Sequence, residues 1–171
     1  ETHHSADILN EEPLLPRIQD YAAVFLVNQT VLSREFGAAL KDYVRKGGCL
    51  VLEGSNLGAD ESELSGVTPV SSAEASKWSA PVQKYVWLPI DGEAVPVRTP
   101  GQMIRCNQAQ PLLPLLSGPD PRHDATPFPA ATLRSFGKGR VLSIHVPLLA
   151  YFQEVHYPRL RDVFRRLMTK L

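Results

Sequence analysis

The chain of 171 residues is long enough for one domain with a packed core, since 43% of its residues are hydrophobic. Its 18 basic and 18 acidic side chains give a formal net charge of zero, which argues against nucleic acid or an anionic membrane as a partner. No apolar run reaches the roughly 18 residues that a membrane-spanning helix needs. Two cysteines cannot build a disulfide framework, which favours a soluble protein of a reducing, cytoplasmic compartment. The sequence does not begin with methionine, so we expect a piece of a longer protein.

The amino-terminal part predicts two strands joined by an irregular connection. The first is a short strand over Asp7 to Leu9, and Pro13 and Pro16 interrupt the polar stretch that follows it. The second covers Ala22 to Val27, an unbroken apolar run that is typical of a strand covered on both faces. We therefore expect this second strand at the centre of a sheet.

An amphipathic helix is predicted next. Ser33 suits the N-cap position, and from Phe36 onward apolar residues recur at i, i+4, i+7 and i+8, which gives the helix one apolar face. Gly47 and its following glycine predict the end of the helix, because glycine adopts the left-handed C′ conformation without a steric penalty.

A buried strand over Cys49 to Leu52 follows this helix, so residues 21–54 predict a parallel βαβ crossover. Sheets of this kind bind ligands at the carboxyl ends of their strands. The candidate ligand-binding residues at these strand ends are Asn28, Gln29, Glu53, Ser55 and Asn56.

Residues 57–129 predict a loop-rich insertion, because prolines are frequent there and aliphatic residues are sparse. Two strands are expected within it, over Lys84 to Ile90 and Glu93 to Arg98, paired across a tight Asp-Gly turn as an antiparallel insertion or edge. From Pro111 to Pro129 we expect no regular structure beyond a turn.

The carboxyl-terminal part predicts a hairpin and a closing helix. Thr132 to Phe136 and Arg140 to Val146 flank a Gly-Lys-Gly turn, and Pro158 suits the first position of a helix with one apolar face. Five cations on the rest of this helix form either a solvated outer face or a nucleic-acid-binding surface, and the neutrality of the chain favours the solvated face. These cations are Arg159, Arg161, Arg165, Arg166 and Lys170.

The order of these motifs resembles a known family. Tyr21 to Ser55 contains an apolar strand, a polar tip, a Leu-Ser pair, a helix and a Tyr-Val-x-x-Gly-Gly-x-Leu-Val run. Ala130 to Leu171 contains Gly-Lys-Gly-Arg-Val, then Tyr-Phe, then His-x-Pro-x-Leu-Arg. Together these runs resemble the class I glutamine amidotransferase-like domain of glycoside hydrolases, best known as the β-galactosidase trimerisation domain.

The resemblance implies an α/β fold of the flavodoxin-like three-layer type, with a mostly parallel central sheet and an antiparallel hairpin near the C-terminus. It also implies that amidotransferase chemistry has been lost in favour of assembly or of shaping a neighbouring active site, which the fold alone does not establish. The implied partners are the other domains of the parent chain and further copies of this domain, in a homotrimer. We expect residues 1–171 to form a single domain of this kind.

An active amidotransferase of this fold needs a cysteine nucleophile on a tight strand-to-helix elbow, near a histidine that an acidic residue orients. Cys49 follows a glycine at the amino end of its strand, and Cys106 has no glycine-flanked elbow, so neither fits. His145 occupies the strand that carries the catalytic histidine in active relatives, but Pro147 stands where the acid is needed. His145 is therefore read as a hydrogen-bonded histidine at a strand end and kept as a catalytic candidate.

Glu53 is the second catalytic candidate, as the carboxylate at the end of a central strand. Such a residue caps a helix, binds a sugar hydroxyl or acts as an acid/base, but glycoside hydrolysis needs a second carboxylate that the sequence does not indicate. The spacing of His, Asp and Glu does not indicate a metal site, and no phosphate-loop or dinucleotide motif is found, so we expect no metal and no cofactor. Trp78, Tyr85 and Trp87 are candidates for stacking on sugar rings, and Trp87 joins the ligand-binding set.

Three functions from different classes follow from these features. The leading hypothesis is a non-catalytic, amidotransferase-like accessory domain of a carbohydrate-active protein, which assembles oligomers or shapes a neighbouring active site. The first alternative is a carbohydrate-binding module at the carboxyl edge of the sheet. The second alternative is a hydrolase in its own right that uses His145 and Glu53.

Overall fold

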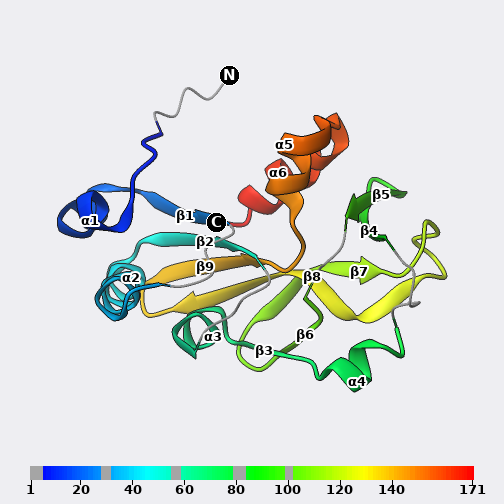
Figure 1. Ribbon diagram of the computed structural model, residues 1–171, viewed down its shortest axis with the longest axis horizontal. Coiled ribbons are helices and arrows are strands. Elements are labelled where there is room, and N and C mark those ends of the chain that lie inside the picture. Colours follow the sequence, from blue (N-terminus) through cyan, green and yellow to red (C-terminus); the bar gives the residue numbers. More distant parts are fainter. Residues whose placement is uncertain (1–5, 28–31, 55–58, 79–83, 99–101) are drawn as a thin grey trace.

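The computed structural model describes residues 6–27, 32–54, 59–78, 84–98 and 102–171 (Figure 1). The helices are α1 Glu11–Leu14, the 3-10 helix η1 Leu15–Asp20, α2 Arg34–Lys46, α3 Ala59–Ser65, α4 Ser72–Ala75, α5 Leu148–Val155 and α6 Pro158–Met168. The strands are β1 Ala23–Val27, β2 Cys49–Glu53, β3 Val67–Pro69, β4 Tyr85–Ile90, β5 Glu93–Arg98, β6 Ile104–Cys106, β7 Gln110–Leu116, β8 Ala125–Phe136 and β9 Gly139–Ile144. Within these described ranges, no helix is both long and apolar enough to cross a membrane.

The main sheet has seven strands in the order β1-β2-β9-β8-β7-β4-β5. Only the β1–β2 and β2–β9 pairs are parallel, whereas β9–β8, β8–β7, β7–β4 and β4–β5 are antiparallel. The chain is therefore an α/β protein with a mixed sheet. The prediction of a flavodoxin-like sandwich with a mostly parallel sheet was wrong, because the five strands β9, β8, β7, β4 and β5 pair antiparallel and come from segments that were expected to be loops or local hairpins.

The proline-rich segment contains two of these strands, so the prediction of irregular structure from Pro111 to Pro129 was also wrong. β7 and β8 pair over this segment with register shifts beside Pro111 and Pro114. Proline removes a ladder hydrogen bond but is tolerated at bulges, and the shifts provide such positions. Residues 57–129 thus supply β4, β5, β7 and the first part of β8 to the main sheet. The assignment of residues 1–171 to a single domain stays a prediction.

Helices cover both faces of the sheet, with α2 and α3 on one side and α5 and α6 on the other (Figure 1). On the first side, Phe36, Leu40 and Val44 of α2 pack with residues of β1 and β2 in one apolar cluster. On the second side, Leu160 and Val163 of α6 pack with β2, β4, β5, β8 and β9 in another cluster. This two-sided burial accounts for the apolar run Leu-Val-Leu in β2.

Several local predictions are confirmed. The Ser33 side chain accepts a hydrogen bond from the Phe36 N–H at 3.1 Å, and α2 ends at Gly47, whose φ is 121°. The β4–β5 hairpin turns at Asp91 and Gly92, both with positive φ, and β8–β9 form the expected antiparallel hairpin.

Two predictions near the N-terminus were wrong. Residues Asp7 to Leu9 form no strand, and β1 lies at the edge of the sheet instead of its centre. The apolar run in β1 misled the prediction because its inner face is buried at Val24 and Leu26 while Phe25 remains 44% exposed.

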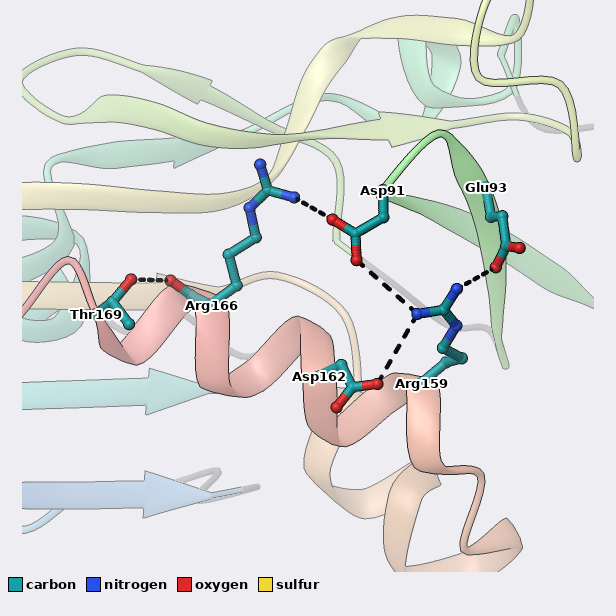
Figure 2. Close-up of polar contacts among 6 residues, drawn as sticks. All are labelled: Asp91, Glu93, Arg159, Asp162, Arg166 and Thr169. Carbon is teal, nitrogen blue, oxygen red and sulfur yellow. Dashed lines mark hydrogen bonds and ion pairs between the residues drawn. The ribbon is translucent and has the colours of Figure 1, made fainter. Parts of the chain in front are cut away.

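Ion pairs fasten one flank of α6 to the β4–β5 turn (Figure 2). Arg159 Nη2 lies 2.6 Å from Glu93 Oε2, and its Nη1 lies 3.8 Å from Asp91 Oδ2 and 4.0 Å from Asp162 Oδ2. Arg166 Nη1 lies 3.4 Å from Asp91 Oδ1. Two of the five cations that were expected on a merely solvated face are therefore part of a network between distant elements.

We expect Arg159→Ala to lower the urea midpoint of unfolding slightly, because exposed ion pairs contribute little individually but Arg159 joins three carboxylates. The difference from the unsubstituted chain should vanish at high salt, which screens such pairs. Arg161→Ala, an exposed substitution in the same helix, is the control and should change nothing. Equal midpoints for the two variants at low salt would contradict the network's contribution.

Candidate functional site

The carboxyl ends of the three parallel strands meet at one edge of the sheet, which the sequence predicted for β1 and β2. There Val27 of β1 is in register with Glu53 of β2, which is in register with Ile144 of β9. Glu53 is buried at this edge, with 3% of its surface exposed. The other predicted ligand-binding residues at the strand ends lie outside the described residues, and their role stays a prediction. These are Asn28, Gln29, Ser55 and Asn56.

The Glu53 carboxylate caps the N-terminus of α5. Its Oε2 accepts a hydrogen bond from the Leu149 N–H at 2.8 Å, and its Oε1 accepts from Leu149 N–H at 3.0 Å and Ala150 N–H at 3.2 Å. The local N-cap residue, Pro147, has no side-chain acceptor for these groups. Glu53 therefore supplies from β2 the capping acceptor that the residues beside α5 lack.

Burial disfavours the ionised form of Glu53, whereas the hydrogen bonds from α5 favour it. Burial raises the pKa of Glu53 from 4.5 to about 7, while the hydrogen bonds from Leu149 N–H and Ala150 N–H act in the other direction. A negative charge at a helix N-terminus also interacts favourably with the helix dipole. Desolvation thus places the titration of the Glu53 carboxyl group near pH 7, and both its oxygens accept hydrogen bonds from α5.

His145 is buried and has no charged partner in the part of the chain that the structure describes. It is 1% exposed, and its Nε2 lies 3.0 Å from Thr132 Oγ1, with which it shares a hydrogen bond. Burial lowers the pKa of His145 from 6.5 to about 4, so the ring is neutral at pH 7. The interpretation of His145 as a hydrogen-bonded residue at a strand end fits this geometry.

Glu53 and His145 lie on opposite faces of the sheet. Register partners in a parallel pair point to the same face, so Glu53 points to the same side as Ile144. His145 follows Ile144, and its N–H continues the ladder by donating to Ala130 O at 2.8 Å, so its side chain points to the other side. The two residues proposed for a hydrolase therefore cannot act on one substrate atom.

Among the described residues, two buried polar side-chain atoms have no hydrogen-bond partner, and both belong to neighbours of His145. Ser143 Oγ precedes His145 on the same face of β9, and Gln102, whose Oε1 is the second such atom, donates its N–H to His145 O at 2.8 Å. Buried polar atoms usually have a partner, often an ordered water. The cluster has no exposed nucleophile, because Ser143 and Thr132 are each almost fully buried.

The aromatic candidates do not join Glu53. Trp87 is half-buried on β4, and β9, β8 and β7 lie between β2 and β4, a separation of roughly 19 Å for strands about 4.8 Å apart. Trp78 packs edge-on against Phe128, and the Tyr85 ring lies 6.5 Å from that of Tyr151. Phe128, and with it Trp78, lies beyond Ala131, the register partner of Ile144, and so on the carboxyl side of β9, but neither ring contact includes Glu53.

The cysteines, the metal-ligating side chains and the cavity do not indicate a further site in the described part of the chain. Cys49 and Cys106 are both free thiols, and burial raises the pKa of Cys106, which makes it a weaker nucleophile. Within the described ranges, no three His, Cys, Asp or Glu side chains gather as a metal site. A cavity of about 40 Å³ lies between α6 and the β4–β7 strands, lined by residues that include Ile90 and Val163. It is far smaller than the ~300–1,000 Å³ of a typical ligand pocket.

The capping role of Glu53 was one of three roles considered from the sequence, but its partner, α5, was missed. Leu148, Tyr151, Phe152 and Val155 recur at i, i+3, i+4 and i+7, which is the pattern of an amphipathic helix. This spacing was the available signal for a helix directly after the last strand. A helix at that place gives the carboxylate of Glu53 a structural partner.

No protein-family model and no curated relative match the sequence. Solved structures match its fold. Gan42B, a GH42 beta-galactosidase from G. stearothermophilus, matches at 19% identity and a TM-score of 0.61 over 89% of this chain and 22% of that chain. The exo-beta-1,4-mannosidase Op5Man5 from Opitutaceae bacterium strain TAV5 matches at 15% identity and a TM-score of 0.58, over 84% of this chain and 23% of that chain.

A different protein shares the fold over most of its own chain. The N-terminal domain of mmIFT52 matches at 15% identity and a TM-score of 0.54, over 94% of this chain and 81% of that chain. This chain therefore spans only 22% of the beta-galactosidase chain but has the size of a separately solved domain. At these identities the similarity concerns the fold.

Glu53 and His145 give opposite pH dependences of stability. The folded chain holds a proton on Glu53 between about pH 4.5 and 7, so this contribution to the free energy of unfolding grows as pH falls. The folded chain keeps His145 neutral between about pH 4 and 6.5, so the unfolded chain binds the extra proton and this contribution is lost as pH falls. Each amounts to about 3 kcal/mol, and the two nearly cancel.

We expect single substitutions to reveal this cancellation. Glu53→Gln keeps an acceptor for α5 but does not titrate, so its stability relative to the unsubstituted chain should fall on acidification from about pH 8 to pH 5. His145→Asn should show the reverse trend. Urea unfolding across this pH range measures both, and two curves that stay parallel to that of the unsubstituted chain would refute the assignment.

Proposed function

We propose that this chain is a non-catalytic accessory domain of a carbohydrate-active protein of the glycoside hydrolase class, which works through contacts with other domains of its parent. The role includes assembly of the parent protein or the shaping of a neighbouring active site. Descent from class I glutamine amidotransferase-like domains is part of the proposal and rests on the sequence resemblance alone.

The observation that carries the proposal is the engagement of Glu53 by α5. A catalytic acid/base or nucleophile must reach the substrate, but this carboxylate is 3% exposed and accepts hydrogen bonds from two backbone N–H groups of the helix. A retaining or inverting glycosidase also needs a second carboxylate within about 5–10 Å, on the same side of the sheet. Within the described residues, the other catalytic candidate, His145, points to the opposite side.

The extent of the structural matches supports a modular role. The fold of this chain corresponds to 22% of a beta-galactosidase chain and 23% of an exo-beta-1,4-mannosidase chain, so in both proteins it accompanies a much larger part. Folds recur among unrelated functions, so this correspondence supports the class of parent protein only together with the sequence resemblance.

The two alternatives have less support. A carbohydrate-binding site at the carboxyl edge loses two of its members, because Glu53 is occupied by α5 and Trp87 is roughly 19 Å away across the sheet. Its other members lie outside the described residues. A hydrolase that combines Glu53 with His145 conflicts with their placement on opposite faces.

We expect the isolated chain to hydrolyse neither p-nitrophenyl β-galactoside nor p-nitrophenyl β-mannoside nor glutamine, because the two catalytic candidates, Glu53 and His145, are both buried and point to opposite faces of the sheet. Steady-state assays at high protein concentration measure this. Glu53→Gln and His145→Asn serve as controls for trace contaminants. Turnover that either substitution abolishes would overturn the non-catalytic role.

The resemblance implies a homotrimer, and sedimentation velocity of the isolated chain at tens of micromolar tests it. A species of three times the 18.9 kDa chain mass is the expected result. A strict monomer would remove assembly by this domain alone and leave the shaping of a neighbouring domain as the accessory role.

A further inference from the structure

The two edges of the main sheet differ in how they are protected. At the β5 edge, Pro96 interrupts the backbone donors, and Glu93 and Arg98 form ion pairs with Arg159 and Glu154. Charges and proline at an edge strand prevent further pairing. At the other edge, β1 has the sequence Ala-Val-Phe-Leu-Val, without a charge or a proline. The chain thus blocks one edge and leaves the other suited to an additional strand.

The backbone of β1 has free hydrogen-bonding groups along this edge. Cys49 N–H donates to Ala22 O at 3.4 Å, so residue 22 directs its carbonyl to β2. In a parallel pair, successive residues direct their backbone N–H and C=O groups alternately toward and away from the neighbouring strand. Ala23, Phe25 and Val27 therefore direct these groups away from β2. Among the described residues no strand pairs with this side of β1. Phe25 and Val27 are also 44% and 38% exposed.

A cationic flank of α6 borders the same edge. The Phe164 ring of α6 lies 6.3 Å from the Phe25 ring, which fixes this flank beside β1. Arg161 and Arg165 lie three residues before and one residue after Phe164, and both are exposed. Within the described ranges neither has an ion-pair partner, in contrast to Arg159 and Arg166 on the opposite flank (Figure 2).

The charges of Arg161 and Arg165 distinguish between two kinds of partner for the β1 edge. A second copy that paired β1 with β1 about a twofold axis would bring its own Arg161 and Arg165 toward those of the first, and like charges brought together are unfavourable. A strand that carries carboxylates would instead neutralise them. The edge therefore favours a different polypeptide segment, apolar in the middle and acidic at its ends.

We propose that β1 is a docking edge for an extended, apolar segment with acidic ends from another part of the parent polypeptide, which adds an eighth strand to the sheet. The backbone of Ala23, Phe25 and Val27 provides the hydrogen bonds, the Phe25 and Val27 side chains provide apolar contact, and Arg161 and Arg165 bind the carboxylates. The proposal deepens the accessory role and rests on it, because it names the surface through which the domain contacts its parent.

Two blocked peptides test the proposal with the isolated chain. Both contain alternating threonine and valine, and one ends in glutamate pairs while the other ends in lysine pairs. We expect the acidic peptide to bind at least about tenfold more tightly, with affinity that falls as salt rises. Amide exchange by NMR should show new protection at Phe25 and Val27, whereas the Val24 and Leu26 amides, which point to β2, should be protected already.

A charge reversal provides the decisive control. In Arg161→Glu/Arg165→Glu the preference between the two peptides should invert, because both side chains are exposed and their replacement leaves the core intact. Arg122→Glu, an exposed reversal in the β7–β8 connection, should leave the preference unchanged. Absence of protection at Phe25 and Val27 at millimolar peptide, or an unchanged preference after the charge reversal, would overturn the proposal.

Self-association gives a separate outcome. A dimer that Phe25→Lys dissociates would assign the edge to a second copy and would also overturn the proposal. Glycoside turnover by the isolated chain would instead contradict the accessory role while leaving peptide binding measurable, so the two failures are distinguishable.

Discussion

The hydrogen bonds from α5 to Glu53 are the constraint on which the carboxyl-terminal layer of the chain depends. They join residues 96 and 97 positions apart, and they fix the start of α5 over the end of β2. α5 packs on α6, and α6 covers the second face of the sheet with Leu160, Val163 and Leu167. A buried carboxylate is costly unless its oxygens are satisfied, so this position tolerates the residue only while the helix is in place. The position of α5 therefore depends on Glu53, and the buried carboxylate of Glu53 depends on α5.

The same constraint explains why Glu53, the described carboxylate at the edge of the sheet that suits ligand binding, is not free for a substrate. In an α/β sheet the carboxyl ends of parallel strands are the usual ligand site, but here α5 occupies the carboxylate that ends β2. His145 shows a comparable outcome on the other face, where Thr132 satisfies the imidazole and burial keeps it neutral. Both titratable groups have shifted pKa values, a feature that often marks active sites. In this protein the shifts arise from burial in the packed fold, since no charged group among the described residues contributes to either shift.

Short sequence patterns predicted the elements that are set by residues adjacent in the chain. The Ser33 cap, the glycine stop of α2, the Asp91-Gly92 turn and the β8–β9 hairpin each follow from a few adjacent side chains. The mixed sheet could not be predicted in this way, because β2 pairs with β9 and β4 pairs with β7 across long stretches of sequence, and the prolines of β7 and β8 hide their strand character. Likewise, the carboxylate of Glu53 is recognisable as polar at a strand end, but whether it meets a substrate or a helix depends on α5, which lies far along the chain. Edge and central strands are equally hard to distinguish, since β1 and β2 are both apolar runs.

The asymmetry of α6 connects these points to the outer surface. Its flank toward β4 and β5 has acidic partners, its central face is buried, and its flank toward β1 has exposed arginines beside exposed apolar side chains. Charges beside a strand edge discourage pairing with a like-charged strand, so the two arginines restrict which strand can pair with β1. The protected β5 edge shows that the chain has the means to block pairing where it is unwanted. The absence of these means at β1 is therefore best explained by a strand partner whose charge complements α6.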